Sequence, residues 1–238
     1  MIARHPLLTS CFLLAGCGLG NLAMAADSID DLDYLTDTKR RGELVAIYEQ
    51  ALSNSFSVDG YDGRWTTADR IGGEIRIAPE GGDTWSPWGG LQVAQETLKG
   101  TFTDGGTINS STTFIDLTGG GMIHLRPENE RRNFDPGIVL FGRAGVGFQS
   151  GSVKNLDTGA NGDESGTLPS LRYEFGLGTE LEVAIARRLI LSGGVGINWN
   201  FANESTVLIS NNGKTATSIQ AVYTGALPYW RVGLGIRF

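Results

Sequence analysis

Side chains that could carry out metal, thiol or acid–base chemistry are few in this chain of 238 residues. Its two histidines are His5 and His124, and its two cysteines are Cys11 and Cys17. All of them except His124 lie in the first 25 residues, which we expect to be cleaved off. A metal site made of histidine or cysteine needs several such ligands close together. The sequence therefore predicts no metal site and no thiol catalysis.

Charged side chains are more numerous, and they follow a regular spacing. Arg143 lies out of phase with the apolar side chains of Leu140 and Val146, so an extended chain would turn it to the opposite face. If that face is an interior, its charges must be paired or hydrated. Two interpretations stay open: a charge network that fills the interior, and a narrow pore of low conductance. The ionisable residues that we assign to this interior are Arg70, Glu74, Arg76, Glu96, Asp116, His124, Arg126, Arg143, Arg172, Glu174, Glu180, Glu182, Arg231 and Arg237.

The elements that would position these side chains are β-strands, because apolar residues recur at every second position. Between Leu171 and Ile185 the apolar side chains share one face, and charged residues and glycines share the other. Glycine is unusually common, at 35 of 238 residues. The alternating segments are longer than the about 5–6 residues usual in globular proteins. They are long enough to cross a bilayer as tilted strands, which takes about 9–11 residues.

The sequence ends on an alternating strand whose last residue is aromatic. Its outward members resemble the C-terminal assembly signal of bacterial outer-membrane barrels, and the glycine-rich alternation over 65–238 resembles the small OmpA- and OmpX-type barrels. The resemblance implies an all-β fold, an up-and-down antiparallel transmembrane β-barrel, in the bacterial outer membrane. It also implies two sets of partners: outer-membrane lipid with lipopolysaccharide, and the barrel-assembly machinery during insertion. The assembly signal comprises Trp230, Val232, Leu234, Ile236 and Phe238.

The alternation places seven strands directly, and a single-chain bacterial barrel needs an even number. With the C-terminus in the periplasm, 79–87 and 127–136 are expected to be periplasmic connections. The segments 99–112, 150–168 and 204–220 then become outer loops. We expect the seven strands at 66–78, 88–98, 113–126, 137–149, 169–185, 188–203 and 222–238.

The eighth strand is the difficult part of the prediction. We favour a strand around 44–58, which gives an eight-stranded barrel, although Leu44, Ile47, Tyr48, Ala51 and Leu52 have helical spacing. The alternative is a helix at the membrane surface or in the periplasmic mouth. The missing strand would then come from a hairpin, in which Val207–Ser210 pairs through Asn212-Gly213 with Thr215–Tyr223.

The N-terminus has the form of a signal peptide, which we expect to span residues 1–25. Leu7 to Leu22 is apolar, and Ala23-Met24-Ala25 is a small-x-small cleavage site. A rival cut before Cys17 would leave a lipoprotein. Residues 26–42 are expected to form an acidic periplasmic segment, and 43–238 the barrel.

Catalysis and nucleic-acid binding are not expected. The formal charge of −7 does not suit a phosphate-binding surface. Lipid A deacylases are small barrels with a His-x-Ser pair, but this chain has His124-Leu125-Arg126. We therefore expect no catalytic residues, no cofactor and a monomeric, non-enzymatic barrel with a structural or surface role and a lumen filled by charges. The alternatives are a narrow porin and an envelope lipid-modifying enzyme.

Overall fold

A computed structural model describes residues 40–79, 84–127, 134–158, 163–185, 188–210, 212–213, 216–219 and 225–238. The expected signal peptide and most of the expected acidic segment lie outside these residues. Among the residues described, no helix could span a membrane. Their regular elements are β1 (Arg40–Ala51), β2 (Ser55–Val58), β3 (Tyr61–Pro79), β4 (Trp85–Phe102), β5 (Thr107–His124), β6 (Phe134–Asp157), β7 (Asp163–Thr167), β8 (Leu171–Ile185), β9 (Leu189–Ala202), β10 (Thr206–Ser210), β11 (Ala216–Ile219) and β12 (Gly225–Arg237).

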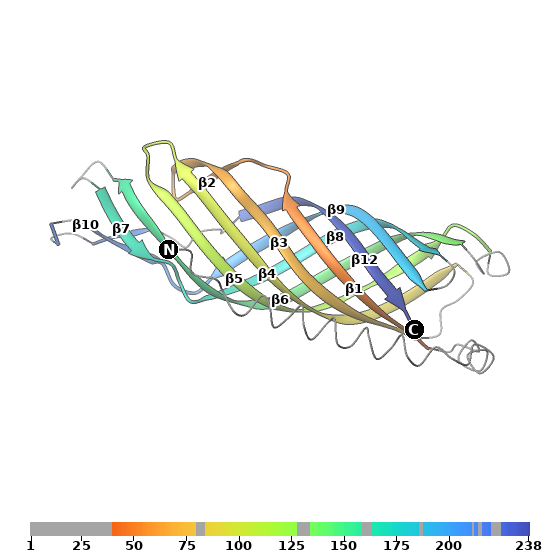
Figure 1. The fold of residues 1–238 in the computed structure, drawn as a ribbon. Coiled ribbons are helices and arrows are strands. Elements are labelled where there is room, and N and C mark those ends of the chain that lie inside the picture. The colour runs from red at the N-terminus through yellow and green to blue at the C-terminus, as the bar shows by residue number, and fades with distance from the viewer. Residues whose placement is uncertain are drawn as a thin grey trace, which may run out of the picture. The chain divides into compact units, whose positions relative to one another are not determined.

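Eight of these strands form a closed ring in the order β1, β3, β4, β5, β6, β8, β9, β12 (Figure 1). Each pairs antiparallel with its neighbours, and pairing of β12 with β1 joins the two ends of the ring. The strands β2, β7, β10 and β11 lie outside the ring. Among the other eight, strands that follow one another in the sequence are also neighbours in the ring. The predicted eight-stranded, up-and-down antiparallel barrel is confirmed.

The eighth strand is β1, so the helical alternative was wrong. Val45 and Ile47 point inward and are buried, although both are apolar. They fit there because Gly235 and Gly233 lie opposite them on β12 and occupy almost no space. Apolar side chains on both faces of β1 explain why its alternation is weak in the sequence. The strand begins at Arg40, three residues before the predicted start of the barrel at 43.

The strands continue well beyond the barrel at the end opposite Phe238, which we call the far end (Figure 1). There β4 and β5 stay paired as far as Thr101 and Thr107, and β6 runs on to Asp157. The expected outer loops are thus largely strands. The hairpin predicted near 207–223 also forms, as β10 and β11, but it pairs with β7 outside the ring and supplies no barrel strand.

Inward apolar side chains explain why these segments are strands. They gather into a core at the far end that includes Leu98, Ile108, Val153 and Leu208, all nearly inaccessible to solvent. The far-end core comprises Val58, Trp65, Leu98, Phe102, Ile108, Val153, Leu156, Leu168, Leu208 and Ile219.

Candidate functional site

The barrel interior is lined with buried charged side chains. They lie on the inner face of the ring strands, which consists of every second residue. Alternation places these side chains on the inner face, and the inward glycines leave the space that long arginines need. The lumen network, as we define it, comprises Arg70, Arg76, Arg143, Arg172, Arg231 and Arg237 with Glu43, Glu49, Glu74, Glu96, Asp116, Asp135, Glu174, Glu180 and Glu182.

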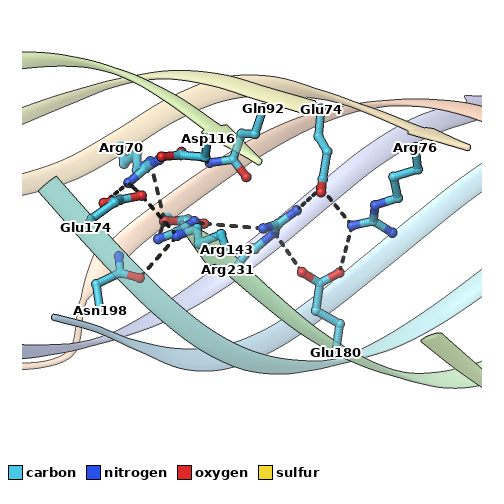
Figure 2. A network of polar contacts seen from close by, with 11 residues as sticks. Arg70, Glu74, Arg76, Gln92, Asp116, Arg143, Glu174, Glu180, Asn198 and Arg231 are labelled. Carbon is cyan, nitrogen blue, oxygen red and sulfur yellow. Dashed lines mark hydrogen bonds and ion pairs between the residues drawn. The ribbon is translucent and has the colours of Figure 1, made fainter. Parts of the chain in front are cut away.

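Arg143 and Arg231 occupy the centre of the lumen network (Figure 2). Two nitrogens of Arg143 donate to the two carboxylate oxygens of Glu49, at 2.6 and 2.8 Å. The Nε of Arg143 also donates to Asn198 Oδ1 at 3.1 Å. Arg231 lies 2.6 Å from a Glu74 oxygen and 3.5 Å from Glu49, so the carboxylate of Glu49 joins the two arginines.

Arg70 and Arg172 extend the lumen network toward the far end. Nη1 of Arg70 donates to both oxygens of Glu174 at 2.7 Å, and its Nη2 donates to Asp116. Arg172 lies 2.6 Å from Glu96. The ring of Phe114 lies beneath both guanidinium groups, with its centroid 4.6 Å from Cζ of Arg70 and 5.2 Å from Cζ of Arg172. Cation–π contact therefore adds to the ion pairs.

Arg76 and Arg237 extend the lumen network toward the other end, where Phe238 lies, which we call the terminal end. Arg76 contacts Glu182 at 2.8 Å and Glu74 at 2.9 Å. Arg237 contacts Glu43 at 2.8 Å and Glu182 at 3.4 Å, so Arg237 and Arg76 both bind Glu182. Glu74 also binds Arg231, so the ion pairs are continuous from the centre of the lumen to its terminal end.

His124 lies at the terminal end and is nearly buried. Its Nδ1 is 2.9 Å from Asp135 Oδ1, and its Nε2 is 2.8 Å from Ser86 Oγ. Asp135 Oδ2 is also 3.6 Å from Arg237, which links the histidine to the lumen network. Ser86 and Asp135 were not predicted as interior residues, because both fall in the expected periplasmic connections, whereas β4 begins at Trp85 and β6 at Phe134.

Arg126 is the one residue assigned to the interior that does not lie there. Strand β5 ends at His124, so the alternation that would turn Arg126 inward has already stopped. Its side chain is exposed, and its guanidinium lies over the ring of Phe134, with 5.1 Å between Cζ and the ring centroid.

Glu43 and Glu49 were missed for a different reason. Both lie on β1, whose alternation is obscured by the inward Val45 and Ile47. Once β1 is accepted as a strand, the six-residue spacing of the two glutamates places them on one face. Among the residues described, no group of histidine, cysteine and carboxylate side chains could hold a metal ion.

The outside of the ring has the opposite character. Leu117 and Leu181 are 71% and 63% exposed. Other large apolar side chains are exposed at alternate positions along the ring strands. Trp85 and Phe134 are exposed at the terminal end, as expected for an aromatic girdle. An apolar outer belt around a charged interior suits hydrocarbon and not water. The protein is an outer-membrane β-barrel.

Comparison with known proteins adds structural neighbours. No family model matches the chain, and no curated protein matches its sequence. The barrel is similar to Ail, the attachment invasion locus protein of Yersinia pestis, at 13% identity over 84% of this chain and 100% of that one, with a TM-score of 0.39. It is similar to a major outer membrane protein from Thermus thermophilus, at 12% identity over 83% and 99%, with a TM-score of 0.43. It is also similar to the outer membrane protein OprG from Pseudomonas aeruginosa, at 9% identity over 83% and 95%, with a TM-score of 0.41.

Proposed function

We propose that this barrel is closed to ions and serves a structural or surface role. In this role it anchors the far-end sheet, which β2, β7, β10 and β11 form with the extended ends of the ring strands, outside the membrane. One observation carries the proposal: ion pairs join strands on opposite sides of the ring. Arg143 and Glu49 connect β6 with β1, and Arg70 and Glu174 connect β3 with β8. In a ring of eight strands, each of these pairs of strands is four positions apart.

Such pairs obstruct the lumen because they lie across its full width. An eight-stranded barrel is only wide enough for side chains to fill it. A permeating ion would have to separate buried, hydrogen-bonded charges, and leaving a buried charge unpaired costs about 3–5 kcal/mol. The far-end core, which includes the buried Trp65 and Leu98, adds an apolar layer on the far-end side of the lumen network. This arrangement favours a filled lumen over a narrow porin.

The far-end sheet supports the surface role. It is built from β2, β7, β10 and β11 together with the extended ends of the ring strands, and it has its own apolar core. With the C-terminus in the periplasm, this sheet stands outside the cell. The apolar belt then lies against outer-membrane lipid, with lipopolysaccharide around the far end. This role requires no catalysis in the lumen network.

Single-channel recording in planar bilayers tests the proposal. The wild-type protein should give no conductance steps. The double variant Glu49→Ala with Arg143→Ala removes one bridge while keeping the lumen charge unchanged, and it should conduct. Arg126→Ala is the matched control, because this arginine lies outside the lumen.

Heat-modifiable gel mobility would establish that each variant is folded before recording. Regular steps from the wild-type protein would instead support the narrow porin. A folded double variant that stays closed would show that the bridge is not part of the seal.

A further inference from the structure

We propose that Ser86, His124 and Asp135 form a hydrolytic triad at the terminal end of the lumen, acting on esters with a short acyl group. This activity goes beyond the structural role and does not depend on it. The two hydrogen bonds, Oγ to Nε2 at 2.8 Å and Nδ1 to Oδ1 at 2.9 Å, lie within the range of about 2.6–3.2 Å that a nucleophile, a base and its orienting group require.

Three neighbouring strands bring these residues together. Ser86 is on β4, His124 on β5 and Asp135 on β6. Ser86 lies opposite Met122 on β5, which is two residues before His124. Gly137 on β6 lies opposite His124, and Asp135 is two residues before Gly137. Each hydrogen-bonding partner of His124 is therefore two residues away from the position directly opposite it. A displacement of two residues keeps side chains on the same face and brings diagonal neighbours into reach. The three side chains therefore meet on the inner face.

The hydrogen bonds also fix how protons are arranged. An ionised carboxylate only accepts, so the Nδ1–H of His124 donates to Asp135. The lone pair of Nε2 is then free to accept the Oγ–H of Ser86, which is the arrangement that a general base needs. His124 and Asp135 are 6% and 3% exposed, whereas Ser86 is only half-buried. The nucleophile is therefore the most accessible member of the three.

A cavity beside Ser86 and His124 suggests the class of substrate. Apolar side chains of Trp88, Met122 and Val139 line part of it, and Arg76 lines another part. The cavity has room for about one water molecule, which is close to the size of a methyl group, so the acyl group beside the serine can be no longer than acetyl. Glu43 and Glu182 also line the cavity, and Arg76 is ion-paired with both of them, so it carries no free positive charge for an oxyanion.

The reaction would follow the usual course of acyl transfer to serine. Ser86 Oγ attacks the ester carbonyl carbon while Nε2 of His124 takes the hydroxyl proton. The tetrahedral oxyanion collapses, the C–O bond to the alcohol breaks, and His124 returns the proton to the leaving oxygen. Water then attacks the acyl carbon with its proton passing to His124, the bond between this carbon and Ser86 Oγ breaks, and His124 returns the proton to Oγ. The products are the carboxylic acid, the alcohol and free serine.

The test uses the full-length barrel in detergent, with 4-nitrophenyl acetate and with methanesulfonyl fluoride, a serine-directed probe whose methyl group is as small as that of acetyl. The probe should modify Ser86, identified by peptide mass spectrometry, and the ester should be hydrolysed. Ser86→Ala should abolish labelling, and His124→Gln should slow both reactions by about 10²–10⁴-fold. Ser192→Ala is the matched control, because this half-buried lumen serine on β9 does not line the cavity, and it should leave both reactions unchanged.

Two results would overturn the triad. One is a folded wild-type protein whose Ser86 takes up no probe. The other is labelling of Ser86 that proceeds equally fast in the folded His124→Gln variant, since the serine would then react without its base. Because labelling reports on covalent chemistry at one atom, a purely structural role for the three hydrogen-bonded residues would not produce it. Neither result bears on whether the lumen conducts ions.

Discussion

Glu49 and Arg143 meet across the full width of the barrel, although 94 residues separate them in the chain. Both carboxylate oxygens accept from the guanidinium, at 2.6 and 2.8 Å, and both side chains are nearly buried. Since β1 and β6 lie on opposite sides of the ring, this pair can form only when the ring is closed. It thus ties the N-terminal strand to the middle of the chain.

Removing one partner of this pair should be costly. Glu49→Ala leaves Arg143 with only part of its compensation, and we expect the free energy of unfolding to fall by about 3–5 kcal/mol. Replacing both residues by apolar ones, Glu49→Leu with Arg143→Met, should be less destabilising than the single change, because the arginine that loses two hydrogen bonds is removed as well, while Arg231 keeps Glu74 and Glu180. Urea titration in detergent micelles, followed by tryptophan fluorescence, measures both. A double variant less stable than Glu49→Ala would contradict the argument.

The inward glycines of β12 allow a second, paired test. A methyl group at Gly235 would collide with the backbone of Leu44 and Val45, which cannot move away. A methyl group at Gly233 would meet first the hydroxyl of Ser192, which can rotate away. Gly235→Ala should therefore cost about 1–3 kcal/mol of unfolding free energy, and Gly233→Ala clearly less. The same urea titration compares them, and equal losses would show that packing against β1 is not the reason for glycine at 235.

The barrel itself could be predicted from the sequence because lipid imposes a strict alternation on a strand. Where that constraint is absent, prediction fails. At the far end, Leu208 and Val153 face a local core among polar residues, so the far-end strands look like loops. In β1 the inward Val45 is accommodated by glycine on another strand, 190 positions further along the chain at Gly235. A single strand's pattern does not contain that information.

The site could be predicted only in part, for the same reason. Alternation identifies a residue such as Arg143 as inward, but which carboxylate it meets depends on the ring order and the register. The Ser86–His124–Asp135 arrangement depends even more on register, because its members come from three strands. Strand ends were the other limit: β4 and β6 each begin three residues before the predicted start, and these additional residues contain Ser86 and Asp135.

The far-end core should fold with some independence from the membrane-spanning ring. Leu208 is fully buried in it, whereas its neighbour Val207 is half exposed. Leu208→Ala should lower the local stability by about 2–5 kcal/mol, while Val207→Ala should change little. We expect limited proteolysis to cut the far-end sheet of Leu208→Ala much faster, with the heat-modifiable mobility of the barrel retained. Loss of that mobility would mean that core and ring unfold together.

The terminal aromatic residue should matter more for assembly than for the finished fold. The backbone of Phe238 exchanges two hydrogen bonds with Gly42, at 2.8 and 2.9 Å, and these remain when the side chain is truncated. The ring itself is 69% exposed, so Phe238→Ala should reduce the unfolding free energy of the purified barrel by less than about 1 kcal/mol. If the assembly machinery recognises the last strand by this residue, the same variant should reach the outer membrane in much smaller amounts. Leu181→Ala removes a similarly exposed apolar side chain from β8 and serves as the control. Equal amounts of both variants in the heat-modifiable band of the outer-membrane fraction would rule out an assembly role for Phe238.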